Sequence, residues 1–322
     1  MIHSALLIAS QLLAPLVACK GSICAPTLQL EAVDTPSEES TPELLQRVVV
    51  IGASVSGGYG ITPELVATAR FGDFLECLLP EDWPEVEDLG NTSMFTDPHK
   101  LGTRMIEGAL ESDPTLVVAV DFLFWFSYSS WRAKGDRAEE LEAGLALLDR
   151  LDCPIVLGNL PDMSPAIGGV GPHGGPMLTR SMVPSESELD RFNERIESWA
   201  KERGNVTIVP MAEMVSTMLS GEELVIRGNR WPAGSLSRLL QKDLLHPNIE
   251  GTIALSILVF QSLSTSYPEL SLDGLSWQAE GIRSKLMERT EEVRQKRLDR
   301  KRRWEERRNR RSSGEDESGD GG

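Results

Sequence analysis

The chain has 322 residues, of which 32 are Lys or Arg and 49 are Asp or Glu, so its formal net charge is −17 at pH 7. Hydrophobic residues make up 40% of the chain, which excludes a wholly disordered protein and is enough for a compact core. The acidic balance argues against nucleic acid as a partner of the main body. Four cysteines, at positions 19, 24, 77 and 153, form no CxxC pair and are too dispersed for a disulfide scaffold or a zinc module.

The first residues predict a leader over positions 1–19. Ser4–Ala18 is apolar and uncharged, and its length is typical of a signal-peptide core rather than of a membrane span. The sequence Leu16-Val17-Ala18-Cys19 is similar to a bacterial lipobox, in which Cys19 would carry a lipid. This pattern predicts export to the periplasm or cell envelope. Because Met1-Ile2-His3 contains no basic residue, a buried first helix of a cytoplasmic domain is the alternative.

A linker over residues 20–44, rich in Ser, Thr, Pro and Glu, precedes a body in which two kinds of segment alternate. Short β-branched runs predict strands at 47–51, 115–121, 154–158 and 206–209, with a weaker strand before Gly90. Helices are predicted over 63–79, 99–111, 137–151, 185–203, 211–220 and 249–263. Continuous apolar strands that alternate with helices indicate a parallel sheet covered on both faces. We therefore expect one three-layer α/β/α domain over 45–268, a flavodoxin-like, doubly wound parallel sheet of about five strands.

A charged helical extension is predicted over residues 269–311. Arg283–Arg311 contains 14 basic and 6 acidic residues, a net charge of +8. Acid-before-base pairs four residues apart, such as Glu292 and Lys296, favour a long solvated helix, and binding to an anionic surface is the second interpretation. Residues 312–322 carry four acids and no base, and we expect them to form a disordered acidic tail.

A glycine-rich turn, Gly52–Gly60, follows the first predicted strand. One interpretation is a phosphate-binding loop, but the turn has neither GxGxxG nor Gly-Lys-Ser/Thr. The other is that Ser54 lies on a tight turn at the strand end and presents its hydroxyl to a site. Ligand sites of doubly wound sheets lie beyond the carboxyl ends of the strands, and a serine there needs a base to become a nucleophile.

Only four histidines could supply that base, and position favours His246. His3 belongs to the leader, His99 to a helix start and His173 to a Gly/Pro-rich loop within 161–184, which is either a lid or a plain surface loop. Asp243 lies three residues before His246, so its carboxylate can orient the imidazole as in a Ser-His-Asp triad.

Three blocks of the sequence resemble the SGNH (GDSL-type) hydrolase family: VVIGASVSGGYG at 49–60, LGNTS at 89–93 and DLLHPN at 243–248. The resemblance implies that Ser54 is the nucleophile and that Asp243 and His246 complete the triad. It also implies an oxyanion hole made by the backbone N–H groups of Ser54 and Gly90.

The chain departs from the family pattern at two places. Ala53 stands where the family has an acidic residue, and the oxyanion-hole Asn of the third block is missing after Asp121. Loss of one oxyanion donor typically lowers turnover by about 10²–10³-fold. Asn91 or Asn159 could replace it, and Asp121 and Asn159 are predicted to bind substrate. The aromatic run 122–126 is predicted to line a pocket or to belong to the core.

The sequence therefore predicts a monomeric serine esterase or acyl hydrolase that needs no cofactor or metal and acts on a small-molecule, carbohydrate-linked or lipid-linked ester. One alternative is a glycan O-acetyltransferase with the same triad. Another is a catalytically impaired SGNH-like binding protein of the cell envelope. A membrane-associated scaffold is a third, since a lipid on Cys19 or the basic helix could bring the chain to a membrane.

Overall fold

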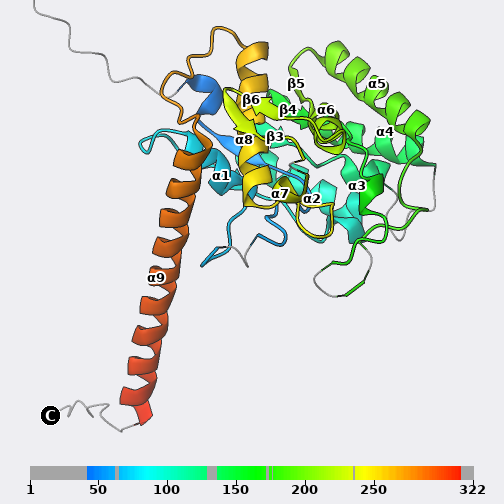
Figure 1. The fold of residues 1–322 in the computed structure, drawn as a ribbon. Coiled ribbons are helices and arrows are strands. Elements are labelled where there is room, and N and C mark those ends of the chain that lie inside the picture. The colour runs from blue at the N-terminus through cyan, green and yellow to red at the C-terminus, as the bar shows by residue number, and fades with distance from the viewer. Residues whose placement is uncertain are drawn as a thin grey trace, which may run out of the picture. The chain divides into compact units, whose positions relative to one another are not determined.

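The computed structural model describes residues 42–61, 65–128, 136–171, 174–175, 177–234 and 236–312 (Figure 1). The predicted leader with Cys19, most of the linker, His173 and nearly all of the acidic tail lie outside the described residues. What the sequence predicts for those segments stays a prediction.

Five parallel strands form the centre of the fold, in the order β2-β1-β3-β4-β5. They are β1 (Val48–Val50), β2 (Glu87–Asp88), β3 (Leu116–Ala119), β4 (Ile155–Gly158) and β5 (Val206–Val209). Val49 pairs with Glu87 of β2 on one side and with Val117 of β3 on the other. Every side chain of β1, β3 and β4 is buried, because helices cover both faces of the sheet. The predicted doubly wound α/β/α fold is confirmed.

The helices form two groups. In the first, α1 (Phe71–Leu78) contacts α8 (Ile249–Ser266), and in the second α4 (Arg137–Leu148) contacts both α2 (Pro98–Glu111) and α5 (Glu186–Arg203). This grouping follows from right-handed crossovers in both directions from β1. The remaining helical segments are α3 (Phe124–Ser127), α6 (Met211–Leu219), α7 (Leu236–Leu239) and the short turns η1 (Glu43–Leu45), η2 (Met94–Thr96) and η3 (Ser164–Ala166).

The first helix starts later than the sequence predicts. Its predicted range is 63–79, but α1 begins at Phe71. Arg70 is extended, and its backbone N–H donates to the carboxylate of Asp73 at 2.7 Å, which closes the helix start. The Phe71 N–H donates to the carbonyl oxygen of Ser56 at 3.1 Å. The segment before the helix is therefore held against the turn that follows β1.

A two-stranded hairpin, which the sequence did not predict, joins α6 to α7. Its strands are β6 (Leu224–Ile226) and β7 (Asn229–Trp231), and they pair antiparallel. Arg227 and Gly228 between them both have positive φ, 50° and 81°. A two-residue hairpin of this kind usually carries Asn-Gly or Asp-Gly, and Arg-Gly is a weak signal for it.

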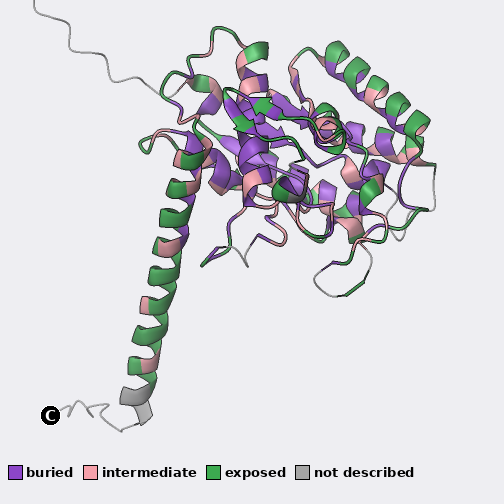
Figure 2. Ribbon diagram, viewed as in Figure 1, coloured by how far each residue is buried: buried purple, intermediate pink, exposed green. Residues whose placement is uncertain are grey.

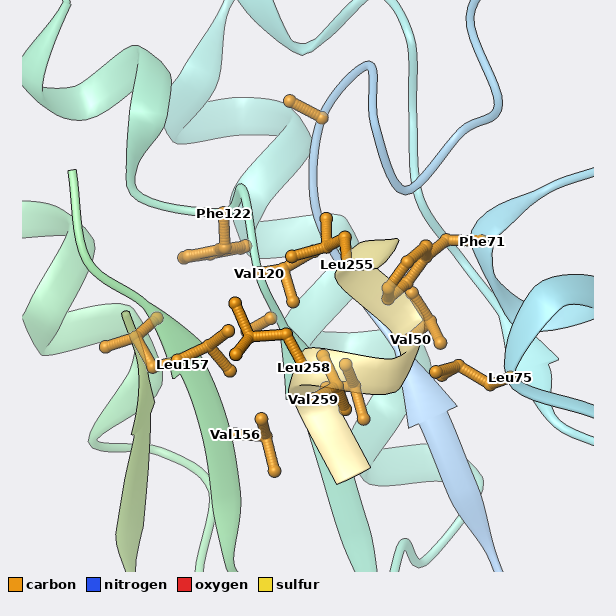
Figure 3. Packing of buried hydrophobic residues seen from close by; sticks show 14 of the residues in the cluster. Val50, Phe71, Leu75, Val120, Phe122, Val156, Leu157, Leu255, Leu258 and Val259 are labelled. Carbon is orange, nitrogen blue, oxygen red and sulfur yellow. The ribbon is translucent and has the colours of Figure 1, made fainter. Parts of the chain in front are cut away.

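Helix α8 is the apolar centre of its layer. Figure 3 shows its residues Leu255, Leu258 and Val259 packed beside Val50 of β1 and Leu75 of α1. Among the described helices, α8 alone is long and apolar enough to cross a membrane by length and composition, but 67% of it is buried inside the structure. Its apolar character is accounted for by this burial.

Helix α9 (Ala279–Ser312) is the predicted charged helix, and its two halves differ in environment. The first half packs against α1 and α8 through Ile282, Leu286 and Thr290, which are all buried. Arg283 pairs with Glu250 of α8. After Glu291 almost every described side chain is exposed, as Figure 2 shows by the green colour of the lower helix.

We expect the buried half of α9 to contribute more to the free energy of unfolding than the exposed half. Leu286 is fully buried and Leu298 is 42% exposed on the same helix. We expect Leu286→Ala to lower the free energy of unfolding by about 2–4 kcal/mol, because it leaves a cavity against the body. Leu298→Ala should change it by less than about 0.5 kcal/mol. Urea unfolding of the two variants measures the difference, and equal values would show that α9 does not pack as described.

Candidate active site

The turn after β1 places two serines in different environments. Ser56 is fully buried, and its hydroxyl donates to Oδ1 of Asp121 at 2.6 Å and lies 3.3 Å from the Ile51 carbonyl oxygen. Ser54 is half-buried and lines a cavity. Of the two, Ser54 is therefore the serine whose hydroxyl has access to a substrate.

The carboxylate of Asp121, directly beyond β3, holds this turn in place. Its Oδ1 accepts from the Ala53 N–H at 2.9 Å and from the Ser56 hydroxyl, while its Oδ2 accepts from the Val55 N–H at 2.7 Å. The Ser56 N–H adds a longer contact of 3.4 Å. Burial raises the pKa of Asp121, and these hydrogen bonds oppose the rise. Asp121 was predicted to bind substrate, but both of its oxygens are already bound to the turn.

Two glycines, which have no Cβ, let the neighbouring backbone segments come close to the turn. Gly52 has a φ of 153°, and a Cβ there would collide with the carboxylate of Asp121 and the hydroxyl of Ser56. A Cβ on Gly90, after β2, would lie 2.6 Å from the Cβ of Ser56. Both glycines are therefore required for the close approach of backbone to turn.

The predicted oxyanion-hole donors differ in their availability. The Gly90 N–H donates to Asp88 at 2.9 Å, so in this structure it is not free to bind an oxyanion. The Asn91 N–H donates to the Gly52 carbonyl oxygen at 2.8 Å, and its Oδ1 accepts from Ser93. Within the described residues, neither the Ser54 N–H nor the Nδ2 of Asn91 has a hydrogen-bond acceptor. These two groups are the available donors beside the turn.

Asn159, the second asparagine predicted to complete the oxyanion hole or bind substrate, is instead bound to helix α6. Its Nδ2 donates to Glu213 at 3.0 Å and its Oδ1 accepts from the Ala212 N–H at 2.7 Å. The side chain therefore holds the first turn of α6 against the end of β4. It does not line the cavity beside Ser54, which argues against its predicted role in substrate binding.

Asp243 and His246 form a buried pair directly before α8. The Nδ1 of His246 lies 2.8 Å from Oδ2 of Asp243, and their exposed fractions are 2% and 3%. Oδ1 of Asp243 accepts from the backbone N–H groups of Leu245 and His246. Burial alone would raise the pKa of Asp243, but the hydrogen bonds from His246 and the backbone hold it below its ordinary value. The carboxylate therefore stays ionised at neutral pH and can orient the ring.

The loop that carries this pair has a strained backbone. Leu244, between Asp243 and Leu245, has a φ of 56°, in the left-handed region that an L-residue with a large side chain rarely occupies. The N–H groups of Leu245 and His246, which both donate to Oδ1 of Asp243, hold Leu244 in this conformation. Strain of this kind is concentrated at functional sites, which supports a functional role for the loop.

Two residues that sequence reasoning missed join the serine turn to the histidine loop. The ring of Tyr59 lies 4.4 Å, centroid to centroid, from the ring of His246. Nε2 of Gln241 donates to the carbonyl oxygens of Tyr59 and Pro247, each at 2.8 Å. No hydrogen bond joins Ser54 to His246 in the described part of the chain, but such bonds are often formed only with substrate bound.

The cavity beside Ser54 is small and apolar, with a free volume of about 70 Å³. Leu245 and Pro247, on either side of His246, line it together with Ser54. Four methionines line it as well: Met163, Met211, Met214 and Met218. Of the predicted aromatic run, Phe124 lines the cavity, whereas Phe122, Trp125 and Phe126 are buried in the core. Among the described residues, no group of three His, Cys, Asp or Glu side chains could hold a metal ion.

The sequence blocks that resemble the SGNH family occupy two places in this fold. Ser54 follows β1, and the Asp243–His246 pair precedes the last helix of the sheet domain. The fold itself is a doubly wound α/β/α sheet.

No family model and no curated protein matches the chain. Solved structures with a similar fold include a lipase/acylhydrolase from Enterococcus faecalis (15% identity, TM-score 0.46), where the match covers 72% of this chain and 98% of the other. TesA is 17% identical over 69% of this chain and 99% of its own, with a TM-score of 0.43. A gut microbial diltiazem-metabolizing enzyme is 16% identical over 67% of this chain, but the match covers only 46% of that enzyme, with a TM-score of 0.42.

Replacement of Asp121 tests its role in holding the turn. In Asp121→Asn an amide N–H must face one of the backbone donors, so at least one buried hydrogen bond is lost. We expect the free energy of unfolding to fall by about 2–4 kcal/mol. Asp162→Asn, at an exposed aspartate, is the matched control and should unfold like the wild type. Similar denaturation midpoints for the two variants would contradict this role.

Proposed function

We propose that the chain is a serine esterase in which Ser54, His246 and Asp243 cleave an ester bond. The observation that carries the proposal is the position of Ser54 at an apolar cavity whose wall also includes the residues beside His246. His246 is in turn bound to an ionised carboxylate. A nucleophile, a base and a group that orients the base are the parts that acyl transfer needs.

The reaction follows from these positions. As the hydroxyl oxygen of Ser54 attacks the ester carbonyl carbon, Nε2 of His246 takes the hydroxyl proton, and Asp243 stabilises the imidazolium that forms. The Ser54 N–H and the Asn91 amide donate to the oxyanion. His246 then gives its proton to the departing alcohol, which leaves an acyl-enzyme on Ser54. Water, deprotonated by His246, attacks this acyl group, releases the acid and restores the Ser54 hydroxyl.

The shape of the cavity supports an apolar acyl group of limited length. Its lining is apolar except for Ser54 and Asp121, so a charged or strongly polar acyl group would lose hydration without a partner. A volume of about 70 Å³ is filled by only a few carbon atoms. The methionine side chains are flexible, which allows some adjustment to chain length. A butyryl ester is therefore the substrate size that we favour.

One observation favours a second function. The family's third-block Asn is missing after Asp121, and the Gly90 N–H is already bound to Asp88. With two of the three expected donors lost and only the Ser54 N–H left, the chain could be an SGNH-like protein that binds an ester-bearing ligand and cleaves it poorly. The same experiments separate the two functions, because a binding protein does not need an activated Ser54.

A pair of serine variants tests the nucleophile. Ser54→Ala should abolish both hydrolysis of p-nitrophenyl butyrate and labelling by a fluorophosphonate probe, because the attacking oxygen is gone. Ser56→Ala is the control, since its hydroxyl is buried on Asp121, and it should keep measurable hydrolysis and labelling. If wild type and Ser54→Ala react equally, the catalytic assignment is wrong and the binding function is favoured.

A methionine variant tests the acyl pocket. Met218 is buried and lines the cavity, so Met218→Ala should enlarge it and move the preferred acyl chain from butyryl toward hexanoyl or octanoyl esters. The expected change in the ratio of kcat/KM values is about tenfold, the usual effect of a few methylenes in an apolar pocket. Met287→Ala, on the exposed side of α9, should leave the ratio unchanged. An unchanged ratio in Met218→Ala would place the acyl group elsewhere.

A further inference from the structure

Helix α9 extends past the edge of the sheet that carries the candidate site. Near its start, the Ser276 N–H donates to the carbonyl oxygen of Leu78, the last residue of α1. Further on, Lys296 shares a groove with Thr68, which precedes α1. Helix α9 therefore runs from the end of α1 toward its beginning, and α1 begins beside the Ser54 turn. The residues after Lys296 lie beyond that edge, as the lower part of α9 in Figure 1 shows.

The side of α9 that faces the body changes its chemistry at this edge. Ile282, Leu286 and Thr290 are buried against the body at intervals of four residues. The helical repeat continues the same line through Val293, Arg297, Arg300 and Trp304. Where the body covers this side, its cations Arg283 and Arg289 pair with Glu250 and Glu76 of the body. Where the body ends, the same side carries cations that the body does not pair.

We call this basic surface the cationic face. It consists of Trp304 and six cations: Lys296, Arg297, Arg300, Lys301, Arg307 and Arg308. Asp299 and Glu306 lie on other sides of the helix by the same repeat, whereas Glu305 borders the face beside Lys301. Of the six cations, only the two lysines have an ion pair among the described side chains, and both pairs are 3.9 Å long. The face is thus available to an anionic partner.

The shape of this corner of the molecule restricts the partner. A flat bilayer laid on the cationic face would also meet the body, because the body packs on the same side of the helix. A single-stranded nucleic acid usually stacks its bases on several aromatic rings, whereas the cationic face has only Trp304, which Arg308 covers at 4.8 Å. A linear polyanion can lie across the face without meeting either difficulty. The six cations extend over about 18 Å of the helix axis, from Lys296 to Arg308, which gives a linear polyanion several contacts along its length.

We propose that the cationic face binds an acidic polysaccharide that carries the ester cleaved at Ser54. The second half of this inference rests on the proposed function. A polysaccharide supplies hydroxyl groups for O-acylation and carboxylates for the arginines, whose guanidinium groups bind carboxylates in a bidentate way. The acidic body would repel such a polymer, and the cationic face provides the attraction that overcomes this repulsion. Because α9 runs past the beginning of α1, a long polymer bound there would extend from the helix toward the edge of the sheet where Ser54 opens.

Binding is tested with the full chain and carboxymethyl dextran, with uncharged dextran as the control polymer. Isothermal titration calorimetry should show binding of the charged polymer alone, weakening as salt is raised. Arg300→Glu, on the cationic face, should weaken it roughly tenfold. Arg302→Glu is the matched control: it makes the same charge change two residues on, nearly opposite on the helix, and Arg302 already pairs with Asp299. Equal weakening in both variants would show general charge attraction and overturn the proposal.

Catalysis is tested with the same two polymers after butyrylation to equal extent. The wild type and Arg302→Glu should hydrolyse the charged polymer with a roughly tenfold higher kcat/KM than the neutral one, and Arg300→Glu should lose that preference. If p-nitrophenyl butyrate is cleaved but the polymers are not distinguished, this inference fails and the proposed function stands. If no ester is cleaved but the charged polymer binds through Arg300, the proposed function fails and the polysaccharide site stands.

Other partners give different results. Tighter binding to anionic phospholipid vesicles or to single-stranded RNA than to carboxymethyl dextran would overturn the proposal. So would concentration-dependent dimers, seen by light scattering, that Arg300→Glu abolishes, because the cationic face would then bind the acidic body of a second copy.

Discussion

The four hydrogen bonds to Asp121 are the constraint on which the site depends. They connect the end of β3 to the turn after β1 and fix which serine is buried and which faces the cavity. An Asn in the same place could not accept all four bonds, because one side of an amide is a donor. The carboxylate thus has a positioning role, and the Ser54 N–H and the Asn91 amide are the donors beside the turn that remain available for the proposed reaction.

The same constraint extends to the histidine loop through Tyr59. The turn that Asp121 holds ends near Tyr59, whose carbonyl oxygen accepts from Gln241 and whose ring lies against His246. Gln241 also binds the Pro247 carbonyl oxygen, so it connects both sides of the candidate site. A shift of the serine turn would therefore be transmitted to the base. Relative placement of nucleophile and base within a fraction of an ångström is what acyl transfer requires.

The parts of the site that sequence could predict are those encoded locally. Asp243 and His246 lie three residues apart, and a short loop is enough to bring them together. The strands were predicted because runs such as Val48–Val50 are apolar without interruption. The role of Asp121 was not predictable in this way, since it lies 68 positions from Ala53 and only the strand order makes them neighbours. The hairpin was not predicted because Arg227 takes a positive φ, which an Arg in the sequence does not indicate.

The line of residues along α9 from Ile282 to Trp304 passes from the body into solvent, and the two environments place different requirements on its side chains. While the body is beside the helix, that line has to be apolar, because each side chain on it is removed from water. Beyond the body the need for burial ends, and exposed leucines on the same line would favour association. Cations at these positions keep the helix solvated, and i,i+3 pairs such as Arg294–Glu291 on its other sides stabilise it. Solvation alone, however, does not require that acids be absent from one side. The proposed polyanion, approaching from the side of the body, would account for this separation of charge.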